Sequence, residues 1–567
     1  MAASNADIAK VFDEIADLLE ILDENAFRVR AYRNAARLIE GLGDSVSEII
    51  AKGEDVTELP GIGKDLAKKI GEIVATGTCA ALEDLRKKLP PTITTLLRIP
   101  GLGPKRVQAL YRNLDISTPE QLYAAVTEGK VRGLPGFGEK TETAIRQALG
   151  PKMAAGGRFT LAAAAQAAEP LREYLAQTPG VTAAVVCGSY RRARETVGDL
   201  DIVVTAERSE AAMDRFCEYP EVAEVKAKGD TRATVVLKSG LQVDLRVVPA
   251  ESFGAALHYF TGSKTHNVAV RRIAQQKKLK INEYGVFRGN RRIAGATEES
   301  VFESIGLGFI PPELRENRGE IEAAQAGTLP ALVALGDLKG DLGVAPPDFN
   351  DGLDRLVDAA RRASLQYLAV RVRTRNRSAA EIGRDLAAVA AARSRCRGFT
   401  LFAAIIADID EDGALALPAI DLDDVDFLGG AIESAFALPR AKQTQRVLRA
   451  LEHPRLKLLA HPAGRLIPER DALDLDLPRI IRAARERRCL LELDSRPDRL
   501  DLPDSYCRLA KEEGTPIAVT SSASTPADLD RLRFGVAQAR RGWLDPSSVA
   551  NTRSADEVKE LLGAARR

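Results

Sequence analysis

Two aspartates separated by one residue, Asp199 and Asp201, open a β-branched run in the stretch GDLDIVV. Side chains at positions i and i+2 of a strand point to one face, so this run would present both carboxylates together. A later run, LQVDLRVV, follows a Ser-Gly turn and carries Asp244 on the same alternation as Gln242 and Arg246. Three carboxylates on neighbouring strands repel one another unless cations are bound. Such a cluster suits two Mg²⁺ ions about 3.5–4 Å apart, one activating a hydroxyl and the other holding a triphosphate.

A turn rich in hydrogen-bond donors precedes the paired aspartates. Gly188 and Ser189 follow the run TAAVVC, and two arginines come directly after them in GSYRR. Exposed backbone amides and guanidinium groups are good donors to phosphate oxygens. A Gly-Asp pair alone is more often an ordinary turn beside a solvated strand edge. The adjoining donors favour a site for a triphosphate and its metal ions.

These motifs are part of a longer series of motifs that resembles a known protein family. GSYRR, GDLD and VDLRVVP, followed by YFTGSKTHNVAVR and INEYGVF, closely resemble the palm and fingers of the family X DNA polymerases, the group that contains DNA polymerase beta. The resemblance implies a template-directed, gap-filling repair polymerase that uses two Mg²⁺ or Mn²⁺ ions and no organic cofactor. It also implies that Asp199, Asp201 and Asp244 bind the metals, with Asp244 as the base toward the primer 3′-hydroxyl.

The same resemblance implies a set of nucleotide-binding residues. One group binds the triphosphate, a second lies under the sugar, and a third contacts the minor-groove edge of the incoming base and the template. These groups are Gly188, Ser189, Arg192 and Gly198; Tyr259, Phe260 and Gly262; and Asn267 with Arg271. Arg158 would add a weaker phosphate contact. Val197 stands where some relatives offer a hydroxyl to the phosphate, so that contact is not expected.

The elements that must bring DNA to this site lie in the first 150 residues. One design occurs three times, as LPGIGKDLAKKI from Leu59, IPGLGPKRVQAL from Ile99 and LPGFGEKTETAI from Leu134. Each Pro-Gly-x-Gly turn leads into a helix whose free amides suit a phosphate, the pattern of a helix-hairpin-helix motif. A single copy would be an ordinary helical corner, whereas three predict binding to the DNA backbone. The predicted DNA-binding residues are Gly61, Gly63, Lys64, Lys68, Gly101, Gly103, Lys105, Arg106, Gly136 and Gly138.

Lys69 has a separate prediction. The N-terminal part resembles the small lyase domain of the same family, in which a lysine at this position forms a Schiff base with a 5′-deoxyribose phosphate. A lysine beside other cations has a lowered pKa and becomes nucleophilic. Asp65 and Thr78 occupy places where relatives carry lysine. The sequence leaves a lyase nucleophile and a phosphate-neutralising surface lysine equally open.

The C-terminal region resembles the polymerase-and-histidinol-phosphatase (PHP) domain of the bacterial members. That domain binds three metal ions through histidines and acids, beginning with a Gly-Asp-Leu-His-x-His run, but this chain reads GDLGVA from Gly340 to Ala345. Arg371 to Arg373, Ile406, Glu433 and Ser522 stand at other ligand positions, and only Asp408 and His461 match. Fewer than three ligands hold a metal poorly. We therefore expect a PHP fold without its 3′–5′ exonuclease. The alternative is a weaker site formed by Asp408, Glu433, His461 and acids of the IDLDDVD run.

The fold class that follows is multidomain, α+β and α/β. We expect a helical lyase-like domain with the first helix-hairpin-helix (1–90), a DNA-binding helix-hairpin-helix region (91–150), a nucleotidyltransferase palm (151–250), a fingers-like nucleotide-selection subdomain (251–318), a linker (319–335) and a PHP-like distorted α/β barrel (336–567). Repeated β-branched runs predict the palm sheet, and strands alternating with helices predict a largely parallel C-terminal sheet.

Composition narrows the setting. The chain has 567 residues, a net charge of +1 and only four histidines, and its six cysteines form no CxxC pair. We expect no disulfide framework, zinc site, membrane span or secretion signal. These features indicate a cytoplasmic protein. The family resemblance implies a bacterial, nucleoid-associated monomer whose partners are gapped or primed DNA, dNTPs and other repair proteins.

Two other function classes compete with a polymerase. A DNA-end-binding scaffold protein with little catalysis would depend on the repeats and the C-terminal domain, but it would have no physical need for three mutually repelling acids. A template-independent or RNA-directed nucleotidyltransferase would share the Gly-Ser and Asp-x-Asp motifs. The YFTGS segment and the DNA-type repeats disfavour it.

Overall fold

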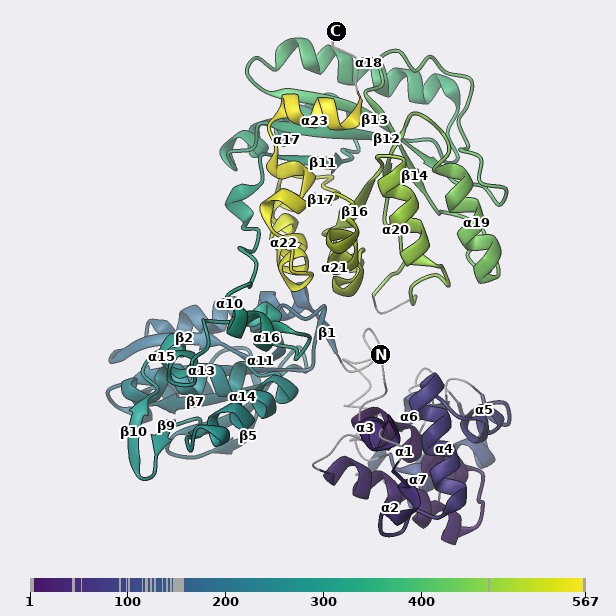
Figure 1. The fold of residues 1–567 in the computed structure, drawn as a ribbon. Coiled ribbons are helices and arrows are strands. Elements are labelled where there is room, and N and C mark those ends of the chain that lie inside the picture. Colours follow the sequence, from purple (N-terminus) through teal and green to yellow (C-terminus); the bar gives the residue numbers. More distant parts are fainter. Residues whose placement is uncertain are drawn as a thin grey trace. The chain divides into compact units, whose positions relative to one another are not determined.

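The computed structural model describes residues 5–42, 46–51, 54–90, 93–97, 99, 102–114, 116–117, 121–122, 125–126, 129–134, 136–138, 141–142, 145, 158–467 and 470–563. The chain divides into two compact units, residues 1–157 and 158–567 (Figure 1). Within the described ranges, no helix is long and apolar enough to cross a membrane. The six cysteines are all free thiols.

The first unit is helical in its described part, as predicted. Its helices are α1 (Asn5–Ile21), α2 (Ala26–Gly41), α3 (Val46–Ala51), α4 (Lys64–Thr76), α5 (Ala80–Arg86), α6 (Ile93–Leu96) and α7 (Pro104–Leu114). Helices α1 and α2 pair through Phe12 and Tyr32, whose ring centroids lie 5.6 Å apart. The amphipathic sequences of α4 and α7 bury Ile70 and Leu110 in the same core.

The second unit begins with a five-stranded sheet of order β2-β4-β7-β6-β5. Its strands are β2 (Val181–Val186), β4 (Asp199–Ala206), β5 (Val222–Lys228), β6 (Arg232–Leu237) and β7 (Gln242–Val248), and helices α10 (Leu161–Ala176) and α12 (Ser209–Cys217) pack against it. The short strands β1 (Phe159–Thr160) and β3 (Thr196–Val197) pair beside it. Strands β6 and β7 form the hairpin predicted at the Ser-Gly turn, and β7 lies parallel to β4. That pairing is what brings the two aspartate motifs together.

The chain then forms the subdomain in which the sequence predicts nucleotide selection. It contains α13 (Phe253–Thr261), α14 (Lys264–Gln276), the antiparallel strands β8 (Lys280–Asn282), β9 (Gly285–Arg288) and β10 (Arg291–Ala294), and α15 (Glu298–Ser304). The segment predicted as a linker contains a helix, α16 (Glu320–Ala326). Its Ile321 and Ala324 join the core of this subdomain, and buried Glu320 contacts Nδ1 of His266 at 2.7 Å. The mixture of polar and small residues in this segment predicted a linker and gave no sign that the segment packs into a core.

Seven parallel strands in sequential order form the C-terminal domain. They are β11 (Gly340–Val344), β12 (Tyr367–Arg373), β13 (Thr400–Asp408), β14 (Phe427–Ala431), β15 (Leu456–Leu459), β16 (Leu490–Asp494) and β17 (Ile517–Thr520). Helices α17 (Asp351–Arg362), α18 (Ala379–Arg395), α19 (Arg440–Ala450), α20 (Leu477–Glu486), α21 (Asp504–Glu513), α22 (Leu532–Arg541) and α23 (Ala555–Leu562) accompany them (Figure 1). A parallel bridge between Val344 and Ala523 links the first strand to the end of the last. The sheet is therefore nearly closed, and the predicted distorted α/β barrel is confirmed.

The local sequence explains why strands alternate with helices in the C-terminal domain. Strands β14, β16 and β17 are buried along their whole length, which matches their nearly continuous apolar runs. Helix α18 begins with a capping box, in which Ser378 and Glu381 each accept a hydrogen bond from the other's backbone amide. Strand ends in such barrels lie at one rim, where the following loops can build a site.

Candidate active site

The three predicted carboxylates of the palm lie together. Asp201 of β4 is directly opposite Asp244 of β7 in the parallel register, and Asp199 is two residues earlier on the same face of β4. Thr234 Oγ1 donates a hydrogen bond to one Asp244 oxygen, and Gln242 Nε2 donates to the other at 3.1 Å. The adjacency predicted from the spacing is therefore observed.

The protein balances the charges of these groups only in part, because the nearest ion pair joins the exposed Arg232 to Asp244 Oδ1 at 3.7 Å. Burial, and after it the neighbouring charges of Asp199 and Asp244, raise the pKa of the Asp201 carboxyl to about 7 against the weaker opposing effects of Arg246 and Arg192. A cluster that binds protons this readily has room for other cations. Carboxylate oxygens are the ligands that Mg²⁺ and Mn²⁺ prefer, so the donor set fits two such ions.

A cavity of about 660 Å³ adjoins the carboxylates, and it collects most of the predicted nucleotide-binding residues. Its lining includes Asp199, Asp201, Gly188, Ser189, Arg192, Arg158, Tyr259, Phe260, Gly262, Asn267 and Arg271. Gly198 and Asp244 are outside this lining, although Arg158 reaches Gly198: a Cβ there would lie 3.1 Å from Nη1 of Arg158. Sequence reasoning missed four lining residues, Arg194, Thr261, Lys264 and Glu316.

The turn predicted to donate to phosphate fits closely against the carboxylates. Gly188 has a φ of 63°, and a Cβ there would lie 2.7 Å from Oδ2 of Asp201. Only glycine satisfies both conditions. Helix α11 (Gly188–Arg191) begins at this residue, and Arg192 follows it. The Arg192 guanidinium donates to the Thr261 carbonyl and, through Nε, to Glu316 Oε1 at 3.1 Å.

Asn267 and Arg271 lie one turn apart on α14, as their spacing predicts. Asn267 Nδ2 donates to the Tyr259 carbonyl at 2.8 Å, which joins α14 to the aromatic end of α13. Arg271 Nε donates to the Asn267 carbonyl at 3.2 Å. The Asn267 Oδ1 atom is buried with no hydrogen-bond partner in the described part of the chain. It is an acceptor that a nucleotide donor could satisfy.

The three N-terminal repeats share two backbone hydrogen bonds in their described residues. In each, the fourth residue of the Pro-Gly turn donates to the first: Ile62 to Leu59, Leu102 to Ile99 and Phe137 to Leu134, each at 3.0 Å. The next helix then begins with an amide donating to the second glycine, at Ala67, Val107 and Glu142. Gly61 and Gly136 have positive φ values, and Lys64, Lys68 and Lys105 are exposed beside the turns. Gly101 lies outside the described residues. The repeat prediction is confirmed in its local structure.

The environment of Lys69 differs from the expectation. Partial burial would lower the pKa of its ammonium, but the hydrogen bond from Nζ to Asp65 Oδ1 and the proximity of Tyr32 outweigh burial and raise that pKa. The expected lowering is therefore wrong, because the residue four positions earlier is a carboxylate that pairs with the lysine. A role as lyase nucleophile stays a prediction.

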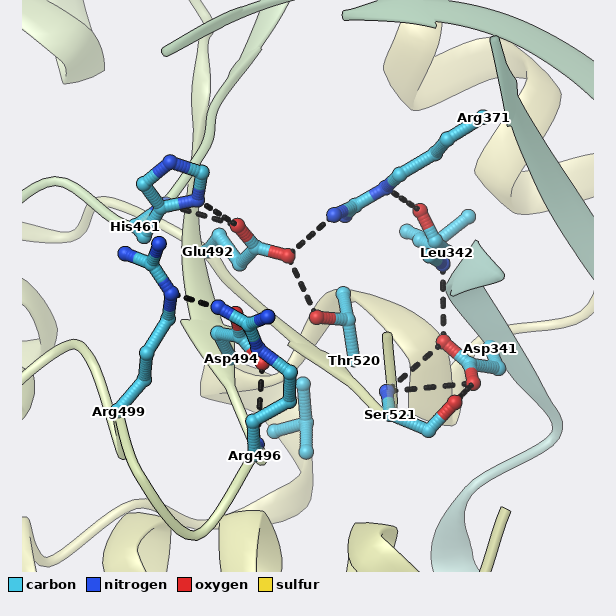
Figure 2. A network of polar contacts seen from close by, with 12 residues as sticks. Asp341, Leu342, Arg371, His461, Glu492, Asp494, Arg496, Arg499, Thr520 and Ser521 are labelled. Atoms are coloured by element: carbon cyan, nitrogen blue, oxygen red, sulfur yellow. Dashed lines mark hydrogen bonds and ion pairs between the residues drawn. The ribbon is translucent and has the colours of Figure 1, made fainter. Parts of the chain in front are cut away.

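In the C-terminal domain a guanidinium lies where the first histidine ligand was expected. A Cβ at Gly343 would lie 2.5 Å from Cζ of Arg371, so the arginine fills the space above this glycine. Arg371 donates to the Leu342 carbonyl at 3.1 Å and to Glu492 Oε1 (Figure 2). Burial opposes ionisation of Glu492, but Arg371 and His461 outweigh it and lower the pKa of this carboxyl. A positive charge from the chain therefore sits inside this site.

The residual ligand pair predicted from sequence is not the group that the structure assembles. His461 lies with Glu492 and Asp494, whose ligand atoms are all within 4.8 Å of one another, and among the described residues Asp408 belongs to no such group. Both Asp408 oxygens accept hydrogen bonds, from the Glu433 amide and the Ser434 hydroxyl. Glu492 and Asp494 occur in LLELD, with the same i, i+2 spacing as the palm aspartates. That spacing is the sequence signal for this group, and it is separate from the histidine motifs of the PHP domain.

Comparisons with known proteins agree with the family predicted from the sequence. Four family models match: two helix-hairpin-helix models over residues 3–79 and 93–152, the DNA polymerase beta palm over 163–273 and the DNA polymerase beta thumb over 256–316. The last lies within the subdomain predicted to be fingers-like, residues 251–318. DNA polymerase/3′-5′ exonuclease PolX of Bacillus subtilis is 33% identical over 98% of this chain and 99% of its own length.

Eukaryotic relatives match over a shorter span. DNA polymerase lambda of Arabidopsis thaliana is 25% identical over 55% of this chain and 62% of its own length. The rat enzyme is 25% identical over 53% of this chain and 56% of its own. With a whole-length relative above 30% identity and a carboxylate cluster beside a donor-rich cavity, the chain belongs to the family X DNA polymerases, the group similar to DNA polymerase beta.

Proposed function

We propose that this protein is a template-directed repair polymerase that fills gaps by adding dNTPs to a primer 3′-hydroxyl. The observation that carries this proposal is the register of Asp201 and Asp244 beside a cavity lined by Ser189, Arg192 and Asn267. It acts as a monomer on gapped or primed DNA at the nucleoid of a bacterial cytoplasm. The helix-hairpin-helix turns support DNA as the partner.

Each group has a definite role in this proposal. Asp199, Asp201 and Asp244 hold two Mg²⁺ or Mn²⁺ ions, which supply charge neutralisation at the reacting phosphate when bound. Asp244, fixed by Thr234 and Gln242, accepts the proton of the primer hydroxyl. Backbone amides at Gly188 and Ser189 and the Arg192 guanidinium orient the triphosphate. Tyr259 and Phe260 limit the space at the sugar.

Primer extension on DNA with a one-nucleotide gap tests the proposal. Wild-type protein should extend the primer with Mg²⁺ or Mn²⁺, and Asp244→Ala should lower the rate on the order of 10³-fold because it removes a ligand and the base. Asp230→Asn, at an exposed acid in the turn between β5 and β6, is the matched control and should behave as wild type. Equal extension by wild type and Asp244→Ala would favour a DNA-end-binding scaffold.

A second part of the proposal concerns the C-terminal domain, in which the 3′–5′ exonuclease has been lost. Gly343 offers no ligand, and Arg371 neutralises Glu492 from within the fold. Arg496 Nε also lies 3.2 Å from Asp494 Oδ2 (Figure 2). A divalent ion would have to displace two guanidinium groups from buried carboxylates, which costs several kcal/mol, roughly.

Incubation of the protein with 3′-labelled DNA and Mn²⁺ tests the loss of the exonuclease independently of DNA synthesis. We expect no shortening by wild-type protein. Shortening that His461→Ala abolishes and Asp244→Ala preserves would show that the C-terminal group binds a metal after all.

A further inference from the structure

One helix of the C-terminal barrel, α22, also packs into the palm. Its Phe534 is 8% exposed and belongs to the hydrophobic core of the palm, and Ala537 packs against the same core. Gln538 and Arg541 follow at the spacing that places these four residues on one face of the helix. Apolar packing makes such a contact between domains persistent, whereas exposed ion pairs alone would contribute little.

The polar residues of this face contact the palm segment that follows the predicted phosphate turn. Arg541 donates through Nη1 to the Arg192 carbonyl at 2.7 Å. Gln538 Nε2 donates to Glu195 Oε1 at 2.7 Å. A second barrel residue, Arg465, holds Glu195 by both terminal nitrogens, at 2.9 and 2.8 Å. The segment from residue 192 to residue 195 is therefore held at both ends by the C-terminal domain.

The backbone between these two contacts has an unfavourable conformation. Ala193 has a φ of 51°, in the left-handed region that favours glycine. A residue in this region persists where the surrounding contacts over-determine its conformation, and the Arg541 hydrogen bond to the carbonyl directly before Ala193 is such a contact. The Ala193 amide donates to the Tyr190 carbonyl at 2.8 Å, and the Arg194 amide donates to the Ser189 carbonyl at 3.0 Å. The conformation of this segment is thus tied to that of the turn at Ser189.

Arg541 also fixes the side chain of Arg192. Its Nη1 atom lies 3.0 Å from Glu316 Oε1, and Arg192 Nε donates to the same oxygen at 3.1 Å. Nη2 of Arg541 donates to Asp504 Oδ2 at 2.7 Å, which anchors the guanidinium to the barrel. Burial opposes ionisation of Glu316, but the positive charges of Arg541 and Arg192 outweigh it and lower the pKa of this carboxyl. Glu316 therefore stays charged between the two arginines.

The side chain of Arg541 lies behind the nucleotide cavity. It is 1% exposed, and it is absent from the described lining of the cavity, which includes Arg192 and Glu316. Any effect of Arg541 on a bound nucleotide must therefore pass through these two residues. Contacts of this kind fix the rotamers of the groups that touch a ligand.

We propose that Arg541 is a positioning residue for the triphosphate site. It holds the main chain of Arg192 directly and, through Glu316, the Arg192 guanidinium. The barrel contributes to nucleotide binding in this way without touching the nucleotide. This inference rests on the proposed polymerase function.

Gap-filling kinetics of the full chain test this role. Arg541→Ala should raise KM for the dNTP about ten-fold and change kcat and KM for gapped DNA less than about two-fold, because a displaced guanidinium weakens binding of the triphosphate. The increase should be equal for all four dNTPs, since they share the triphosphate. Arg541→Lys keeps the charge but cannot contact both acids at once, so its KM for the dNTP should be about three-fold above that of wild type. A wild-type KM for the dNTP in Arg541→Ala would overturn the inference.

A double variant separates positioning of Arg192 from general support of the fold. Arg192→Ala removes the group through which Arg541 is proposed to act. In that background, Arg541→Ala should raise KM for the dNTP less than about two-fold further. The full increase in both backgrounds would show that Arg541 acts elsewhere and would overturn the inference.

Arg540→Ala is the matched control. Arg540 lies on the same helix and also contacts residues outside the barrel, through Glu313 Oε1 at 2.6 Å and the Val333 carbonyl at 3.1 Å. Its loss loosens the contact of α22 without removing a bond to the Arg192 segment, so KM for the dNTP should stay at the wild-type value. An equal increase in Arg540→Ala, or a fall in kcat alone in Arg541→Ala, would mean general loosening and overturn the inference.

Hydrogen exchange read by mass spectrometry tests the same contact without catalysis. In the absence of nucleotide, Arg541→Ala should speed exchange in residues 188–195 at least about five-fold and leave strands β11 to β17 unchanged. If Arg541→Ala instead exchanges faster throughout the barrel, Arg541→Lys decides: wild-type exchange in residues 188–195 together with a wild-type KM for the dNTP would overturn the inference. Absence of extension by wild type would refute the polymerase, whereas the exchange measurement would still report whether Arg541 holds the segment.

Discussion

Two Gly-Asp-Leu runs begin strands in residues 158–567, and their surroundings balance charge in opposite ways. At Gly198 the run continues into Asp201, which faces Asp244 and has a pKa raised to about 7 by burial and by its acidic neighbours. At Gly340 the run continues into Gly343. There Asp341 accepts hydrogen bonds from the amides of Gly343 and Ser521, and Arg371 pairs with Glu492.

The difference shows what makes a carboxylate cluster a metal site. Acids that the chain neutralises only in part, as the exposed Arg232 does for Asp244 at 3.7 Å, take up a cation from solution or bind protons, whereas acids paired with a buried arginine become part of the core. Both clusters have acids at i, i+2 spacing on a strand. The neighbouring strand decides their use: β7 adds another acid to the palm cluster, and β12 adds a guanidinium to the barrel cluster.

Removal of the internal cation should have the largest effect on stability. Arg371→Ala leaves Glu492 buried without its partner, and breaking a buried pair costs about 3–5 kcal/mol. Hydrogen exchange read by mass spectrometry should show faster exchange in β12 and β16 of the full chain. The exposed Arg487→Ala is the matched control. Unchanged exchange in Arg371→Ala would mean that the pair contributes nothing to the barrel.

Adding a side chain at Gly343 should show that the stability contributions of this glycine and of Arg371 depend on each other. A Cβ at Gly343 would lie 2.5 Å from Arg371 Cζ, so Gly343→Ala should cost about 1–3 kcal/mol by overpacking. In the Arg371→Ala background most of this cost should disappear, since the space is then empty. The same exchange measurement on both single variants and the double variant gives the coupling. Additive effects would show that the two positions are independent.

Removal of an acid should change the stability of the protein in opposite directions in the two clusters. The pKa of Asp201 is raised in the folded, metal-free protein, so the native state holds an extra proton between about pH 4 and pH 7 and stability falls as pH rises through that window. Asp201→Asn should therefore stabilise the metal-free palm by about 1–3 kcal/mol at pH 8 and have no effect at pH 4. Glu492→Gln, whose pKa is lowered in the fold, should destabilise the barrel at pH 8.

Both changes in stability are measured by denaturing each variant at pH 4 and pH 8 in the presence of EDTA. Hydrogen exchange in β4 then reports on the palm, and hydrogen exchange in β16 reports on the barrel. Mg²⁺ should remove the advantage of Asp201→Asn, because the wild-type acids then have their cation. A destabilised Asp201→Asn palm at pH 8 would mean that the acids are already neutralised within the fold.

The sequence predicts the features whose interacting residues are close together in the chain, and it predicts sheets whose strand order is a common one. The spacing of Asp199 and Asp201, the hairpin that presents Asp244 and the three Pro-Gly turns are each specified within about ten residues. It failed where a partner comes from another strand. Arg371 was recognised as a positive charge, but its bond to Glu492 spans 121 residues and depends on barrel closure. Glu316, 124 residues from Arg192, was missed for the same reason.

Lys69 and Asp65 extend the comparison to the first unit, where the smallest effect is expected. Here, too, the chain supplies the opposite charge, and the raised pKa of Lys69 leaves less neutral amine to attack an aldehyde. Asp65→Asn should lower that pKa and raise the initial rate of borohydride trapping on 5′-deoxyribose phosphate DNA at pH 7 about two- to five-fold. Lys69→Ala should abolish trapping, and Lys68→Ala, which removes an exposed neighbour, should not. If trapping survives in Lys69→Ala, the nucleophile is another amine, and pairing with Asp65 serves only to hold α4.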